Sequence, residues 1–270
     1  MNSAPSRFPS VFLSHGTPMM ALATGEDADS YTTALHDFFK ALPRPKAIVI
    51  VSAHGTSAEN TVEISAAEHP RIIHDFSHFP AELYQMDYPC PGSPEVAVQV
   101  ATLLSTAGFE TELIRTRLMD HGAWIPLRIA YPEADIPVVQ ISMPFGGGPA
   151  SVLKLGKALA TLRDEGVLLI ASGGAVHNTE LMVWHMKSGP GEEWARVFQE
   201  WLKHMLKTKD VQALIDFEDE APHAKLAQPT PKHFYPVFFA VGASLPGDEA
   251  HTIFEGIQYQ TLSTYAFALS

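Results

Sequence analysis

The sequence predicts an α/β fold: a single domain over residues 1–270, with a central, largely parallel or mixed sheet flanked by helices and a C-terminal hairpin. Three observations predict it. Short β-branched runs alternate with helical patterns along the chain. Two strand candidates, at 47–52 and 167–171, are almost wholly apolar, as is typical of strands buried on both faces of a sheet. No repeat, low-complexity tract or linker divides the chain.

The strands are expected where short apolar runs end in turn residues. Five are predicted, at residues 10–13, 47–52, 111–116, 137–142 and 167–171. The last segment, 251–269, alternates polar and apolar side chains around Glu255 and Gly256. That alternation predicts a hairpin on the edge of the sheet.

Helical patterns fill the intervals between the strands. Four helices are predicted, at residues 30–42, 94–107, 150–162 and 192–206. The second has clear boundaries, because Ser93 can cap it, Pro94 suits its first position and Gly108 follows its end. The segment 67–94 fits neither pattern, since it is irregular and rich in proline and aromatic residues. Long irregular loops of this kind commonly carry function.

Composition excludes several classes of protein. The formal net charge is -12, from 18 basic and 30 acidic residues, and no basic stripe is present, so nucleic acid and anionic membrane are excluded as partners. No apolar run reaches the roughly 18 residues that span a bilayer. Cys90 is the only cysteine, so no internal disulfide can form, and a cytoplasmic location is the simplest expectation.

Four histidines follow predicted strands. His15, His54 and His121 each precede a glycine, and His177 follows a glycine pair. Parallel strands bring their carboxyl ends to one edge of the sheet, where ligands bind in open α/β folds. Imidazole is the commonest metal ligand among side chains and an acid or base near neutral pH. The four positions together predict a metal site with an adjacent proton carrier, although any one of them alone would be an ordinary loop residue.

Two further features belong to this picture. His233 lies between Pro231 and Pro236, whose rings fix the backbone and would hold its side chain rigidly. A histidine in a rigid turn without a function is an equally open interpretation. The glycines at 146–148 and 173–174 lack the spacing of a nucleotide-binding motif, so we expect them to form close-approach turns around the pocket.

The chain contains six blocks in this order: LSHGTPMMAL, SAHG, HDFSHFPAELYQMDYPCPGSPEVA, MDHGAWIPL, SGGAVHN and PTPKHFYP. In these blocks it resembles the extradiol ring-cleavage dioxygenases of the DOPA 4,5-dioxygenase type. These belong to the class III group, which also includes protocatechuate 4,5-dioxygenase. The resemblance extends from about Val11 to the C-terminal hairpin. It implies a mononuclear non-haem iron(II) enzyme that cleaves a catechol ring beside its two hydroxyls and inserts both atoms of O2.

The resemblance also implies roles for the histidines. His15, His54 and His233 match the metal ligands, His177 matches the acid–base residue, and His121 would face the substrate as a second catalytic residue. The wider group uses glutamate as its third ligand, where this chain has His233. Three imidazoles also suit Zn(II), so both metals are open for the same site. His177 is a possible fourth ligand.

The substrate is expected to be a small aromatic diol, used together with O2. Phe76, Tyr84 and Trp124 are candidates to wall its ring, and ordinary core packing is as open for each of them. The sequence fixes neither the catechol nor the oligomeric state. Two alternative functions remain: a zinc hydrolase of a small ester or amide with His177 as its base, and a metal-binding protein without turnover.

Overall fold

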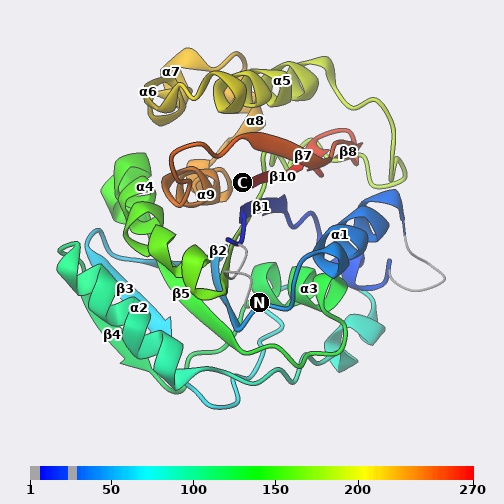
Figure 1. The fold of residues 1–270 in the computed structure, drawn as a ribbon. Helices are drawn as coiled ribbons and strands as arrows, with labels where there is room; N and C mark the ends of the chain where they lie inside the picture. The colour runs from blue at the N-terminus through cyan, green and yellow to red at the C-terminus, as the bar shows by residue number, and fades with distance from the viewer. Residues whose placement is uncertain (1–6, 24–28) are drawn as a thin grey trace.

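A mixed eight-stranded sheet runs through the computed structural model, which describes residues 7–23 and 29–270 (Figure 1). The strand order is β4-β3-β5-β2-β6-β1-β10-β7. The central strands are parallel and largely buried: β5 (Val138–Pro144), β2 (Ala47–Ser57), β6 (Val167–Gly173) and β1 (Ser10–Ser14). One edge is made by β3 (Thr61–Ser65) and β4 (Glu110–Ile114).

The C-terminal strands close the other side of the sheet. β7 (Ala250–Phe254) pairs antiparallel with β10 (Ala266–Leu269), and β10 pairs antiparallel with β1. A small pair, β8 (Ile257–Gln258) and β9 (Leu262–Ser263), lies between them in the chain. The predicted C-terminal hairpin on the sheet edge is therefore confirmed.

Helices cover both faces of the sheet (Figure 1). One face packs against α1 (Ser30–Ala41) and α3 (His121–Ala130), and the other packs against α2 (Pro94–Thr106), α4 (Gly148–Leu159) and α9 (Pro236–Gly242). Successive side chains of β2 supply the two cores in turn, because side chains alternate across a strand. An outer layer holds α5 (Glu193–Thr208), α6 (Val211–Ile215), α7 (Phe217–Glu220) and α8 (Ala224–Ala227).

Short 3₁₀ turns connect several of these elements: η1 (Pro18–Ala21), η3 (Ala81–Gln85), η4 (Phe145–Gly147), η5 (Ala160–Glu165) and η6 (Pro231–His233). In the part of the chain that the structure describes, no helix is long and apolar enough to cross a membrane.

The fold class predicted from the sequence is confirmed, and the predicted boundaries hold to within a few residues. Ser93 caps α2, because its hydroxyl accepts a hydrogen bond from the Val96 N–H. Two elements near the site were not predicted, α3 and α9. The first carries Pro126 in its interior, which argues against a helix in sequence, and the second is buried all round and therefore lacks an amphipathic pattern.

A close crossing of α4 and α9 fixes the segment that carries His233. A Cβ atom on Gly156 would overlap the carbonyl oxygen of Phe239, and one on Gly242 would overlap the carbonyl oxygen of Leu153. The two backbones therefore approach where only glycine fits. Because α9 begins three residues after His233, this contact determines where His233 is held.

We expect Gly156→Ala to lower the free energy of unfolding by about 1–3 kcal/mol, because overpacking outweighs the gain of up to about 1 kcal/mol that alanine brings to a helix. Urea unfolding followed by circular dichroism measures the change. Lys157→Ala, an exposed substitution on the same helix, is the matched control. Equal stability of the two variants would contradict the close crossing.

Candidate active site

Three neighbouring parallel strands bring histidines to one edge of the sheet, as predicted. His15 directly follows β1, and His177 lies four residues beyond the end of β6. His54 differs from the prediction, because it lies within β2 and not after it. The pairing of β2 with β5 shifts register between Val51 and Thr56, so His54 occupies an irregular stretch of the strand.

His121 reaches the same place by another route. The expectation that it follows a strand directly is wrong, because β4 ends at Ile114 and His121 is the first residue of α3. Its approach is fixed two residues earlier, since the N–H of Met119 donates to the carbonyl of Arg71 and the Met119 carbonyl accepts from the N–H of Ile73. The irregular segment between β3 and α2 therefore anchors this histidine.

The backbone of His233 contacts the glycine pair at the end of β6, Gly173 and Gly174. The N–H of Gly174 donates to the His233 carbonyl at 2.8 Å, and a Cβ on Gly173 would overlap that oxygen. The predicted close-approach turn is confirmed here. It is wrong for 146–148, where Gly147 approaches the backbone of Glu59 in the β2–β3 turn and does not reach the histidines.

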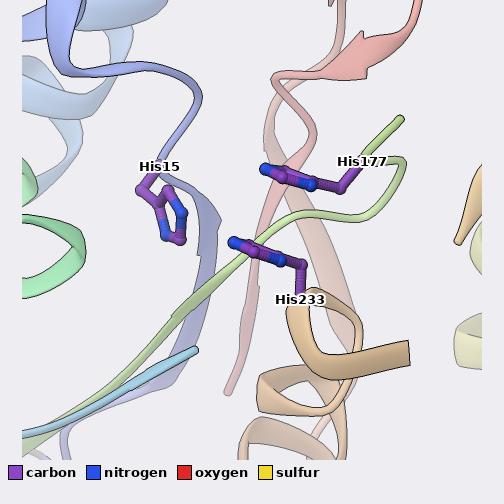
Figure 2. Close-up of side chains that lie close together, drawn as sticks. All are labelled: His15, His177 and His233. Atoms are coloured by element: carbon purple, nitrogen blue, oxygen red, sulfur yellow. The ribbon is translucent and has the colours of Figure 1, made fainter. Parts of the chain in front are cut away.

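The five imidazoles form one cluster. Nε2 of His54 lies 3.2 Å from Nε2 of His15 and 3.4 Å from Nε2 of His233. The rings of His177 and His233 are stacked, 3.5 Å apart and 4° from parallel, with nitrogens turned toward His15 (Figure 2). His121 stands 4.1 Å from His54 between ring centroids. Nitrogens of two sets, His15–His177–His233 and His15–His54–His121, lie within 4.8 Å of one another, close enough to hold a metal ion.

Burial keeps His15, His54, His177 and His233 uncharged. Loss of solvent is the largest cause that lowers the pKa of His15 and His233 well below the usual range, and repulsion from the neighbouring imidazoles adds to it. The same causes lower the pKa of His54 to about 3, and burial lowers that of His177 to about 4. A neutral imidazole keeps the lone pair that a metal needs.

Ser172, on β6, sets the orientation of His15. Its hydroxyl donates to the carbonyl of Gly122, so its oxygen is left to accept from Nδ1–H of His15 at 3.1 Å. The proton of His15 is thereby assigned to Nδ1. Its Nε2 lone pair faces the cluster.

A partly exposed carboxylate holds His121. Oδ1 of Asp75 accepts hydrogen bonds from both Nδ1 and the backbone N–H of His121, each at 2.9 Å. Burial alone would favour the neutral acid, but the hydrogen bonds and charge of His121 outweigh it and lower the pKa of Asp75 to about 2. Sequence reasoning missed Asp75, whose only signal was an acidic residue between His74 and Phe76 in the irregular segment.

A buried acid, Asp120, supports the strand around His54. Asp120 accepts from the Ser52 hydroxyl at 2.6 Å and from the Gln140 amide, and Ser52 in turn accepts from the His54 backbone N–H at 3.2 Å. Burial, opposed by these hydrogen bonds, raises the pKa of Asp120. This carboxyl group therefore links α3 to β2 behind the cluster.

The three predicted aromatic residues have different surroundings. Phe76 meets His121 edge-on with centroids 5.6 Å apart, and Tyr84 lies 5.2 Å from Phe76 and is 39% exposed. Trp124 has no exposed surface, and its indole N–H donates to the carbonyl of Ile73 at 3.1 Å. Trp124 thus supports the 71–76 segment from behind.

Comparison with known proteins identifies the family of enzymes to which this histidine cluster belongs. Residues 9–269 match the family described as the catalytic LigB subunit of aromatic ring-opening dioxygenase. The chain belongs to this family. It is therefore a metal-dependent, extradiol ring-cleaving dioxygenase.

Curated relatives and a solved structure agree with the family. The chain is 40% identical over 262 residues to the 4,5-DOPA dioxygenase extradiol of Escherichia coli K12, covering 96% of this chain and 93% of the relative. It is 39% identical over 249 residues to the protein of the same name from Beta vulgaris, covering 90% and 89%. A crystal structure of an uncharacterised Escherichia coli K12 protein superimposes with a TM-score of 0.82 at 33% identity, covering 98% of this chain and all of that one.

The neutral cluster predicts how stability depends on pH in metal-free enzyme. Unfolded histidines take up protons near pH 6.5, whereas folded His177 and His54 stay neutral down to about pH 4 and about pH 3. Between these limits the unfolded state binds more protons, so stability falls as pH drops below about 6.5, by about 1.4 kcal/mol per pH unit for each such histidine.

Urea unfolding with a chelator, at pH 5 to 7, measures this slope. We expect His177→Ala to reduce the slope of unfolding free energy against pH by the contribution of about one proton. His204→Ala, exposed on α5, should leave the slope unchanged. The same slope in wild type and His177→Ala would show that His177 is not held neutral by burial.

Proposed function

We propose that this enzyme opens the ring of a DOPA-like catechol with O2, using Fe(II) held by His15, His54 and His233. The observation that carries the proposal is the spacing of Nε2 of His54 from the Nε2 atoms of His15 and His233. Two nitrogens that each lie about 2.1 Å from one ion, at right or tetrahedral angles, are about 3.0–3.4 Å apart. The separations of 3.2 and 3.4 Å around His54 match this range.

Three neutral imidazoles suit both Fe(II) and Zn(II), so the donor set alone does not choose the metal. The reaction favours iron, since Zn(II) has no redox chemistry and ring cleavage consumes O2. When bound, iron(II) supplies the electron-transfer chemistry that lets a catechol react with O2. The names of the curated relatives support DOPA as the substrate class.

The protein residues supply binding and proton transfer. His177 is neutral, so one ring nitrogen can accept a proton from a catechol hydroxyl as general base. Its stacking on His233 holds that ring beside the ligands, and its nitrogen is close enough to serve as a fourth ligand when no substrate is present. His121 faces the same space as the second catalytic histidine. Phe76 and Tyr84 would contact the ring of the substrate.

Anaerobic reconstitution tests metal, reaction and substrate together. Metal-free protein is loaded with Fe(II) under nitrogen, mixed with DOPA or another catechol, and then exposed to air. We expect uptake of one O2 per catechol and a yellow ring-opened product, and no uptake with Zn(II). Ester hydrolysis with Zn(II) and no O2 uptake would instead identify a hydrolase. Metal binding without turnover across a catechol panel would identify a binding protein.

Substitution of the histidines should separate ligands from the proton carrier. We expect His15→Ala, His54→Ala and His233→Ala to lose bound metal, because each removes a ligand. His177→Ala should retain most metal and lose about 10²–10⁴-fold in kcat, the usual contribution of a general base. Metal analysis and oxygen-uptake kinetics measure both effects, with His204→Ala as control. Unchanged turnover in His177→Ala would refute its role in proton transfer.

A further inference from the structure

We propose that Asp75 is a positioning residue, whose Oδ1 fixes the rotamer and tautomer of His121 so that Nε2 of His121 presents a lone pair to the substrate. Neither Asp75 nor this arrangement follows from the family match. The effect on turnover rests on the proposed function. The position of the proton on His121 can be measured without it.

The argument begins with one oxygen atom. Oδ1 of Asp75 lies 2.9 Å from the His121 backbone nitrogen and 2.9 Å from Nδ1 of the ring. The backbone N–H can only donate, so the atom facing it must be an acceptor. The same atom faces Nδ1, and Nδ1 must therefore be the protonated nitrogen. In the neutral ring Nε2 is then left with a lone pair.

Asp75 itself is held by the backbone. The 71–75 segment lies along Met119, with N–H···O distances of 2.9 Å from Ile73 to Met119 and 2.8 Å from Met119 to Arg71. The buried indole of Trp124 adds a hydrogen bond to the Ile73 carbonyl at 3.1 Å. These contacts join the segment to the start of α3, so the carboxylate and the imidazole belong to one rigid unit.

The ring of His121 is also confined from its sides. Phe76 meets it edge-on at 5.6 Å, and His54 lies 4.1 Å away between centroids. A flip of the ring would exchange Nδ1 with a carbon atom and lose the bond to Asp75. One nitrogen of His121 lies within 4.8 Å of nitrogens of His15 and His54, and Nδ1 is already used. Nε2 is thus the nitrogen available to a substrate hydroxyl.

Two substitutions separate positioning from charge. Asp75→Asn removes the charge, but the backbone N–H of His121 still requires an acceptor and so directs the amide oxygen, not the NH₂, toward the ring. Asp75→Ala removes the acceptor altogether. Glu82→Ala removes an exposed carboxylate from the same segment and serves as the matched control.

The first readout is the tautomer of His121, from ¹⁵N NMR of histidine-labelled, metal-free protein at neutral pH. We expect Nδ1–H in wild type, Asp75→Asn and Glu82→Ala, and loss of that single tautomer in Asp75→Ala. His121 protonated at Nε2 in wild type would overturn the inference, whether or not any variant folds. Retention of the Nδ1–H tautomer in Asp75→Ala would overturn it as well.

The second readout is oxygen uptake by the Fe(II)-loaded proteins with DOPA. We expect Asp75→Ala to lose about 10–100-fold in kcat with its metal content unchanged, the usual effect of losing a partner behind a site residue. Asp75→Asn should keep most of the wild-type kcat. An equal loss in Asp75→Asn with its tautomer intact would assign the effect to charge and overturn positioning. A wild-type enzyme inactive on every catechol would refute the proposed function, and the tautomer would still decide this inference.

Discussion

Five crowded imidazole rings, of which His15 and His121 are buried and the others half-buried, are the constraint on which this structure depends. A buried ring is stable only when neutral, and two protonated rings at the 3.5 Å separation of His177 and His233 would repel each other strongly. The fold therefore holds imidazole nitrogens whose lone pairs face one another and have few partners to bind. A cation among them removes this cost, because each lone pair then has a partner. The cluster is unfavourable by itself and favourable as a metal site.

Holding such a cluster requires a scaffold that does not relax. Neighbouring strands β1, β6 and β2 supply three of the histidines from one edge of a buried parallel sheet. The fourth, His233, is placed by backbone contacts that tolerate no side chain, at Gly173 and at the α4–α9 crossing. Because these contacts are between main-chain atoms, the separation of the rings depends on packing of whole elements and little on side-chain freedom.

The sequence predicted what local pattern determines. Apolar runs that lead into Ser-His-Gly and Ala-His-Gly, the Ser93 cap and the motif blocks led to the fold class and to the five clustered histidines. It could not predict what depends on distant parts of the chain. The route of His121 was wrong because the bonds between Met119 and the 71–73 segment are non-local. Asp75 was missed for the same reason. The full burial of Trp124 could not be predicted because its helix, α3, was not predicted.

The hydrogen-bond partners of Nδ1 distinguish histidines that are otherwise chemically identical. His15 donates its Nδ1 proton to the hydroxyl of Ser172, a neutral partner that suits an uncharged ring. Nδ1 of His121 faces the carboxylate of Asp75, and hydrogen bonds to an ionised group are stronger than those to a hydroxyl. Nδ1 of His233 is buried and has no hydrogen-bond partner in the described part of the chain, so no contact there fixes the tautomer of this ring. The partner of the outer ring nitrogen therefore differs from ring to ring: a hydroxyl for His15, a carboxylate for His121 and, in the described part of the chain, none for His233.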